Sequence, residues 1–222
     1  RDLRSSMGYI KGDFKTFVLD VSSLEFDLFI RENSYFDYVL NLSALKHVRS
    51  ERDPYTLMRL INVNILNSIK ISKLCIEMKS KNFFSVSTDK SSNPVNLMGA
   101  SKKIMELFLL KNSENIKTTM SRFANVAFSD GSLLHGFINR MEKKQPLSAP
   151  YDVERYFISS SESGELCMLS CLLGNNRDIF YPKTSSKLKL LSIKEITIKF
   201  LNSKGYDAYL CKSEDEARKK ID

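Results

Sequence analysis

The sequence predicts an α/β fold built on a parallel sheet, and three features predict it. Short runs rich in β-branched and aromatic residues alternate with longer amphipathic segments over the first 125 residues. The segments between these runs are long enough for crossover helices. Polar residues directly follow several of the runs. Because right-handed crossovers place every strand-to-helix loop at one edge of a parallel sheet, we expect these polar residues to meet at that edge.

The elements of this first part follow from local patterns. Ser22 and Ser23 should cap a helix that carries Leu24, Leu28 and Phe29. After Asp53-Pro54, apolar residues recur every 3.6 positions and predict a long helix over 55–78. Pro94 breaks the chain, and another helix is expected over 97–110. The predicted strands are residues 14–19, 38–42, 83–86 and 118–123.

Residues 126–222 have a different pattern, with helices expected at 133–141, 162–173 and 193–201. Between them lie short extended pieces at 146–149, 155–158 and 178–181. We interpret this part as a smaller lobe over the loop edge of the sheet. Ligands of open α/β sheets bind at that edge, so the second part is expected to be mainly a substrate-binding lobe.

Composition excludes several classes of protein. Apolar residues make up 42% and charged residues 27%, which is typical of a globular chain. No apolar run approaches the ~20 residues of a membrane span, so we expect a soluble protein with no membrane span. The formal net charge of +8 fits nucleic acid or an anionic small molecule. The basic runs are short and do not alternate with aromatic residues, which disfavours nucleic acid.

The cysteines and histidines indicate no metal site. The four cysteines form no Cys-x-x-Cys pair, and His47 and His135 lie far apart in the sequence. Cys167 and Cys171 are four residues apart among apolar neighbours, as on the buried face of a helix. We interpret them as reduced thiols in the core of a cytoplasmic protein.

The chemically informative segment is 85–102, which begins in the third predicted strand. Thr88, Asp89 and Lys90 place a hydroxyl, a carboxylate and an ammonium in succession at the expected ligand edge. The hydroxyl can donate to a carbonyl or alkoxide, and the other two can exchange protons with a substrate if their environment brings their pKa values toward neutrality. A capped polar turn would show the same three residues. Met98 and Lys102 share one face of the helix that follows.

The run STDKSSNPVNLMGASK resembles the UDP-N-acetylglucosamine 4,6-dehydratases of the polysaccharide-biosynthesis (CapD-like) group in the extended short-chain dehydrogenase/reductase family. Further matching pieces lie in order along the chain: residues 41–48 (NLSALKHV), Asn64, 122–126 (RFANV), 155–157 (RYF) and Glu165. The resemblance implies a Rossmann-like sheet, NAD as cofactor, a UDP-sugar substrate, cytoplasmic location and a homo-oligomer. It also implies that 1–125 is a partial NAD-binding Rossmann domain and 126–222 mainly the substrate-binding lobe.

The glycine-rich half of such a site is missing from the sequence. None of the eight glycines is spaced as Gly-x-Gly-x-x-Gly, the turn that holds the pyrophosphate in dinucleotide-binding folds. We therefore expect the sheet to be incomplete at its N-terminus, with the first βαβ unit upstream of Arg1.

The resemblance implies catalytic roles for Thr88, Asp89, Lys90, Met98 and Lys102. Thr88 would hold the 4-oxygen of the sugar. Asp89 would be the base for the 4-hydroxyl and the acid for the 6-hydroxyl, and Lys90 would take the proton on carbon 5. Lys102 would bind the nicotinamide ribose. Met98 stands where the family usually has Tyr, and a thioether cannot transfer a proton. The Met form resembles the sugar-nucleotide dehydratases that retain the configuration at carbon 5. The alternative is a protein that lost its catalytic activity when it lost the Tyr.

The resemblance also implies binding residues. For the cofactor these are Asp20, Asn41, Leu42, Ser43, Lys46, Asn64 and Lys102. For the substrate they are Lys46, His47, Asn125 and Arg155. Asp20 is also explained as a helix cap, His47 as a structural residue and Arg155 as part of a surface ion pair.

Four functions are compatible with these features. The first is a UDP-N-acetylglucosamine 4,6-dehydratase, a hydro-lyase of surface-glycan, nonulosonic acid or bacillosamine-type sugar biosynthesis. The second is an inverting dehydratase or an epimerase of the same family. The third is an inactive nucleotide-sugar binding protein, and the fourth is a nucleic-acid-binding protein.

Overall fold

A four-stranded parallel sheet forms the centre of the larger part of the molecule. The computed structural model describes residues 15–33, 35–46, 51–150, 152–183 and 190–220. The strands lie in the order β1 (Tyr38–Asn41), β2 (Asn82–Thr88), β3 (Thr118–Phe123) and β7 (Ile179–Phe180). Every pairing in this sheet is parallel. The predicted α/β fold with a parallel sheet is therefore confirmed.

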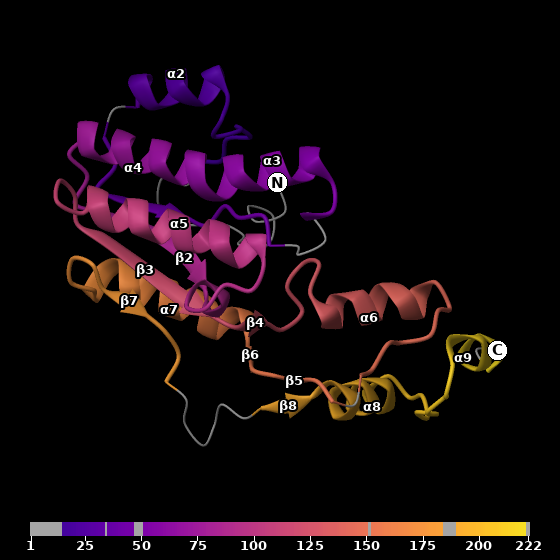
Figure 1. Cartoon of the computed structure of the whole chain (residues 1–222). Coiled ribbons are helices and arrows are strands. Elements are labelled where there is room, and N and C mark those ends of the chain that lie inside the picture. The colour runs from indigo at the N-terminus through magenta and orange to yellow at the C-terminus, as the bar shows by residue number, and fades with distance from the viewer. Residues whose placement is uncertain (1–14, 34, 47–50, 151, 184–189, 221–222) are drawn as a thin grey trace.

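Helices cover both faces of this sheet (Figure 1). One face carries α5 (Leu97–Asn112) and a continuous helix made of α3 (Pro54–Ile61), η2 (Asn62–Leu66) and α4 (Asn67–Glu77). The other face carries α7 (Ser160–Leu173). Further out lies α2 (Leu24–Glu32), which Lys70 joins to α4 through an ion pair of 2.6 Å with Asp27.

The alternating side-chain directions of β2 explain why the sheet has a hydrophobic core on each face. Phe83 packs with Ile71, Cys75, Met105, Leu109, Ile116 and Met120 beneath α4 and α5. Phe84 points the other way and packs with Cys167 and Cys171 of α7. Successive side chains of a strand face opposite sides, so one strand serves both cores. The predicted core positions of Cys167 and Cys171 are confirmed, and both thiols are free.

One predicted strand is not formed. Residues 15–19 form no strand, Val18 is fully exposed, and Phe14 lies outside the described residues. The segment has β-forming residues, but a strand exists only through hydrogen bonds to a neighbour, and no described strand pairs with it. Instead Phe17 packs against Phe29 of α2, with ring centroids 4.6 Å apart.

Local signals account for the helix boundaries. Ser23 caps α2, Asp53 caps α3 with Pro54 in the first turn, and Asn96 caps α5. The long predicted helix is present but passes through the π-helical turn η2, which periodicity did not predict. Single π turns inside helices are often found at functional sites.

Apart from α7 and β7, the second part of the chain lies beyond the carboxyl ends of β2 and β3 (Figure 1). Its helices are α6 (Leu133–Glu142), α8 (Ile193–Ser203) and α9 (Glu214–Lys219). Leu134 and Phe137 of α6 pack against Phe200 of α8. Two small sheets join β4 (Asn125–Val126) to β6 (Phe157–Ile158), and β5 (Glu154–Arg155) to β8 (Leu191–Ser192). The helices α6, α7 and α8 were predicted, whereas α9, β4 and β8 were not.

Within the described part of the chain, no helix combines the length and apolar character needed to cross a bilayer.

Candidate active site

Thr88, Asp89 and Lys90 form one polar cluster at the carboxyl end of β2. Thr88 ends the strand and caps the short 3-10 turn η3 (Asp89–Ser91). Its hydroxyl donates to Asp89 Oδ1 at 2.9 Å, and Lys90 Nζ donates to the same oxygen at 3.2 Å. Asp89 is exposed and the other two are partly buried. A hydrogen-bond donor, a base and an ammonium are thus available together to a ligand from solvent.

Helix α5 begins directly against this cluster. Asn96 caps it by accepting from the backbone N–H of Gly99 at 2.8 Å. A Cβ on Gly99 would lie 2.8 Å from the Lys90 carbonyl oxygen, closer than real contacts allow. Glycine therefore permits the first turn of α5 to lie against the backbone of η3. Met98 is buried at 5% exposure on this turn, and its N–H donates to Glu51 Oε1 at 3.1 Å.

Lys102 lies one turn further along α5 and is only 4% exposed. Its ammonium donates to the Val86 carbonyl oxygen at 3.0 Å and lies 3.6 Å from the Met105 sulfur. Burial lowers the pKa of Lys102 to about 8, although attraction by Glu106 partly offsets this effect. Buried lysines whose pKa lies near neutrality are found preferentially at functional sites, although burying their charge destabilises the fold.

Glu106, another turn along the same helix, is the centre of a buried network. Its Oε1 accepts from Ser87 Oγ at 2.6 Å, Ser91 Oγ at 2.7 Å and Arg122 Nε at 2.8 Å. Its Oε2 accepts from Arg122 Nη2 at 2.6 Å. Burial would raise the pKa of Glu106, but hydrogen bonds from Arg122, Ser87 and Ser91 outweigh it and hold that pKa below the usual value.

Sequence reasoning did not single out Glu106, Ser87 or Ser91 as part of this site. A signal was present, because Glu106 is spaced four residues from Lys102 and eight from Met98. A carboxylate on the buried face of a helix requires a partner. Arg122 of β3 is that partner. It lies directly opposite Ser87 in the parallel register of β2 and β3.

The end of β1 and the loop after it carry four of the predicted cofactor residues, Asn41, Leu42, Ser43 and Lys46, of which Leu42 and Ser43 are exposed. Asn41 is buried, and its Nδ2 donates to Ser68 Oγ at 2.9 Å while its Oδ1 accepts from the Ser43 N–H at 3.3 Å. Asn64 of η2 is fully buried beneath the same loop.

Asn64 uses its whole amide within the protein. Its Oδ1 accepts from the Leu45 N–H, and its Nδ2 donates to the Leu45 carbonyl, each at 2.9 Å. The same Nδ2 donates to Ser101 Oγ of α5 at 3.0 Å. Asn64 therefore fixes the loop after β1 to the helix that carries Met98 and Lys102, and its predicted contact with the cofactor stays a prediction.

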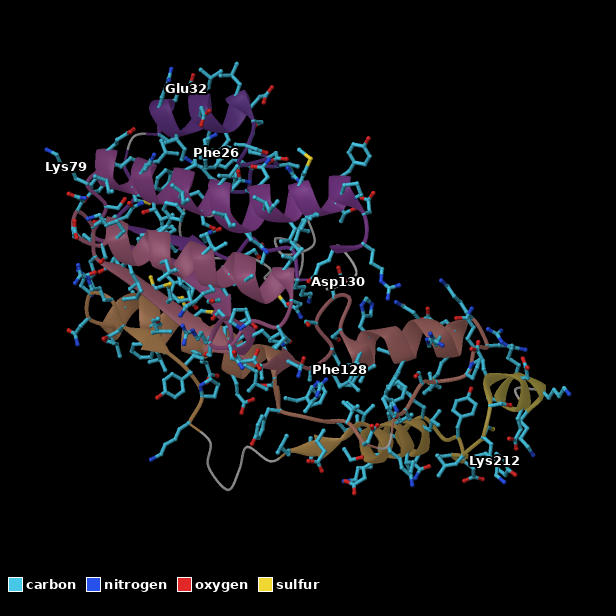
Figure 2. The ribbon with its side chains drawn as sticks, in the orientation of Figure 1. Phe26, Glu32, Lys79, Phe128, Asp130 and Lys212 are labelled. Atoms are coloured by element: carbon cyan, nitrogen blue, oxygen red, sulfur yellow. The ribbon has the colours of Figure 1, made fainter. Side chains whose placement is uncertain are left out.

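The predicted substrate residues bridge to the second part of the chain. Lys46 donates to Ser129 Oγ at 3.2 Å, which joins the loop after β1 to the segment between β4 and α6. Figure 2 labels Phe128 and Asp130, the neighbours of Ser129, at this junction. Asn125 donates through Nδ2 to the Tyr156 carbonyl at 3.1 Å. Arg155 is exposed, and its Nη1 donates to the Glu154 carbonyl at 2.9 Å.

The predicted cofactor residue Asp20 is held away from the Thr88 cluster by its own partners. Asp20 accepts from the N–H and hydroxyl of Ser22 and pairs with Arg59 at the end of α3, at 2.9 Å. The Ser22 hydroxyl, the Ser22 N–H and Arg59 together lower the pKa of Asp20 to about 2. Ser23, not Asp20, caps the helix that follows. His47 lies outside the described residues.

Comparison with known protein families shows which family the chain belongs to. The family described as "Polysaccharide biosynthesis protein" matches residues 6–217. The chain belongs to this polysaccharide biosynthesis protein family.

Curated proteins that are similar to this chain carry different descriptions. A protein of Methanocaldococcus jannaschii described as an uncharacterized membrane protein is 30% identical over 178 residues, 77% of this chain and 52% of that protein. The capsular polysaccharide biosynthesis protein CapD of Staphylococcus aureus is 30% identical over 174 residues, 76% of this chain and 28% of CapD. A UDP-glucose 4-epimerase of Rickettsia bellii is 32% identical over 164 residues, 70% of this chain and 47% of the epimerase. The chain thus spans about half or less of these relatives.

Solved structures share the fold of this family member. Pen from Bacillus thuringiensis superposes with a TM-score of 0.74 at 21% identity, over 84% of this chain and 57% of Pen. The dTDP-glucose 4,6-dehydratase DesIV of Streptomyces venezuelae, as a double mutant with NAD bound, gives a TM-score of 0.70 at 15% identity, over 88% and 70% of the two chains. These likenesses confirm the predicted Rossmann-like fold class.

Proposed function

We propose that this chain carries the catalytic part of an NAD-dependent UDP-N-acetylglucosamine 4,6-dehydratase. The observation that carries the proposal is the Thr88–Asp89–Lys90 cluster at the carboxyl end of β2, beside a helix that holds Met98 and Lys102. Membership of the polysaccharide biosynthesis family and similarity to CapD support a role in making a sugar nucleotide for a surface glycan.

The residues present fit the nicotinamide end of NAD. Within the described part of the chain, the buried ammonium of Lys102 donates to one carbonyl and one thioether, which leaves donor capacity for ribose hydroxyls. The exposed loop of Leu42 and Ser43 lies at the carboxyl edge of β1, where dinucleotides bind in such sheets. NAD, when bound, accepts and returns the hydride of an internal redox dehydration. DesIV, which shares the fold, is described with NAD bound.

The protein side of the reaction is proton transfer and orientation. Thr88 can donate to the 4-oxygen as a ketone forms there. Asp89 accepts the 4-hydroxyl proton and, once protonated, gives a proton to the departing 6-hydroxyl. Lys90 takes the proton on carbon 5. Since Asp89 Oδ1 already accepts from both Thr88 and Lys90, one carboxylate oxygen connects all three roles.

The buried thioether of Met98 argues against a second candidate, the 4-epimerase. Epimerases from Rickettsia are among the similar proteins, and the second candidate rests on them. Met98 cannot accept a hydroxyl proton, so an epimerase reaction would lack its usual phenolic base. The dehydratase keeps a base in Asp89, which favours it, with configuration at carbon 5 retained.

The remaining roles follow from the same proposal. Asn125 and Arg155 would bind the diphosphate or sugar from the second part of the chain, with Arg155 making a charge-assisted phosphate contact. We propose that 1–125 is the partial NAD-binding domain and 126–222 mainly the substrate lobe. The free thiols are consistent with a cytoplasmic location. The exposed apolar residues on α3 and α5 support a homo-oligomer.

The test is the product formed by the whole protein from UDP-N-acetylglucosamine and NAD in heavy water, followed by proton NMR. A UDP-4-keto-6-deoxy sugar with deuterium at carbon 5 and retained configuration is expected. Inversion at carbon 5 would indicate the inverting dehydratase, and a C4 epimer without loss of water the epimerase. Binding of UDP without turnover would indicate an inactive binding protein. Thermal shifts with UDP, NAD and oligonucleotides would separate these readings from nucleic-acid binding.

A further inference from the structure

Glu106 is a buried carboxylate that the proposed reaction does not use. It is 1% exposed, although a buried charge is costly unless it is paired and fully hydrogen-bonded. Its two oxygens accept from Ser87, Ser91 and two nitrogens of Arg122. Such a complete set of partners is well beyond what a helix needs for packing.

The donors come from both sides of the polar cluster. Ser87 immediately precedes Thr88, and Ser91 ends the turn that contains Asp89 and Lys90. The Ser91 hydroxyl lies 2.7 Å from both Glu106 Oε1 and the Thr88 carbonyl oxygen, so it links the carboxylate to the turn itself. Arg122 extends the same network, because its Nη1 donates to Ser92 Oγ at 3.1 Å.

Helix α5 therefore meets the turn at two levels. Near its start, Gly99 lies against the Lys90 carbonyl. Two turns later, Glu106 holds the flanking serines. Lys102 lies between these two levels on the same helix. The distance between the polar cluster and Lys102 is thus set by contacts on both sides of Lys102.

We propose that Glu106, together with Arg122, is a positioning pair that holds Thr88, Asp89 and Lys90 in place relative to Lys102. This inference rests on the proposed function for its kinetic consequence but not for its structural one. Glu106 acts through the serines and the turn and is not itself in reach of solvent. Loss of the pair moves the acid–base groups without removing them.

The experiment uses the whole protein in four variants. Glu106→Gln removes the charge, and Arg122→Lys keeps a charge but loses the two-pronged contact. The double variant Ser87→Ala with Ser91→Ala leaves the ion pair intact and removes both hydroxyls that link Glu106 to the turn, together with the contact of Ser91 with the Thr88 carbonyl oxygen. Glu114→Gln is the matched control, because this exposed carboxylate lies just beyond α5 and pairs only with Lys111 among the contacts described.

Two measurements are made on each variant. The first is backbone hydrogen–deuterium exchange over residues 87–92, which needs no turnover, and faster exchange is expected in all variants except the control. The second is the kinetics of product formation. We expect kcat to fall roughly tenfold to a hundredfold, because misplaced reacting groups have that effect. KM for the UDP-sugar should stay within about threefold, because substrate binding is not altered.

The outcomes separate this proposal from the proposed function. Unchanged exchange over 87–92 in the serine double variant overturns the positioning role, whatever the activity. Wild-type kcat with faster exchange also overturns it, since the turn then needs no fixed position. If Glu106→Gln fails to fold, Arg122→Lys and the serine variant decide by the same two readouts. If the wild type makes no keto sugar, the proposed function fails, while the exchange data still test the structural link.

Discussion

Lys102 donates a 3.0 Å hydrogen bond to the Val86 carbonyl oxygen from a side chain that is almost completely buried. Burial lowers the pKa of this ammonium from 10.5 to about 8. Because the unfolded chain then binds its proton more tightly, the lysine destabilises the fold at neutral pH. The cost is about 3 kcal/mol, from about 1.4 kcal/mol for each unit of pKa. A function is the simplest reason to keep such a group.

Replacement of Lys102 by Met should therefore stabilise the protein and inactivate it. At pH 7 the free energy of unfolding should rise by about 1–3 kcal/mol, since the buried charge is removed. In the wild type, stability should increase as pH rises from 8 to 10.5, the window in which the native state has lost the proton and the unfolded state has not. The Met variant should lack this increase.

Urea unfolding at pH 7 and pH 10 measures both effects, and Lys111→Met on the exposed side of α5 is the control. Equal stability of wild type and the Lys102 variant at pH 7 would contradict the burial argument.

The Glu106–Arg122 pair predicts a second dependence of stability on pH, at low pH. Burial raises the pKa of Glu106, but its hydrogen bonds outweigh this, and the pKa lies below 4.5. The pair therefore stabilises the protein above pH 4.5, and this contribution is lost as pH falls through the lower pKa of the native state. Glu106→Gln should cost about 3–5 kcal/mol at pH 7, because Arg122 loses its buried partner.

The difference from wild type should shrink as the pH falls below 4.5. Thermal unfolding from pH 7 down to pH 3 provides the measurement. A variant that stays equally destabilised throughout that range would show that the charge of Glu106 does not matter.

The acid–base assignment predicts two inactive variants that still bind their ligands. Asp89→Asn and Lys90→Ala should each abolish formation of the keto sugar, because each removes a proton-transferring group that solvent cannot replace in position. NAD and UDP affinities, followed by calorimetry, should stay within about threefold of wild type, since neither group is proposed to bind them. Full dehydration by both variants would exclude the assignment.

The polar cluster could be predicted from the sequence because its parts are local. Thr88, Asp89 and Lys90 are consecutive, and Met98 and Lys102 are separated by one helical turn. Such spacings need only a correct strand end and helix start. The hydrophobic pattern supplied both, and β2 and α5 begin and end within a few residues of the prediction.

The support beneath the cluster could not be predicted in the same way. Glu106 and Arg122 are sixteen residues apart and meet only because α5 crosses β2 and β3. The segment 15–19 shows the converse limit, because strand-forming residues are not sufficient without a paired neighbour. Local sequence patterns thus predict which polar residues form the cluster, while contacts between residues distant in the sequence determine how those residues are fixed in place.

The exposed apolar residues of two adjacent helices predict a dimer interface. Ile104, Leu107 and Phe108 lie on the outward side of α5, and Met58 and Ile61 are exposed on the neighbouring α3. Phe108→Glu should convert a dimer to a monomer, since a charge in an apolar contact is strongly unfavourable. Light scattering after size exclusion measures the mass. Leu173→Glu, exposed on α7, is the control, and a wild-type monomer would contradict the prediction.

The closest approach of α5 to the turn predicts the effect of adding one methyl group. In Gly99→Ala the new Cβ would lie 2.8 Å from the Lys90 carbonyl oxygen, which is backbone and cannot rotate away. We expect a loss of about 1–3 kcal/mol in the free energy of unfolding, as for other overpacked sites. Gly164 in α7 has no atom near its missing Cβ, so Gly164→Ala should stabilise by about 0.5–1 kcal/mol through helix propensity. Chemical denaturation of the two variants compares them directly, and kcat should fall in the first alone. If both alanines stabilise, α5 does not press against the turn, and the spacing between Lys90 and Lys102 is set elsewhere.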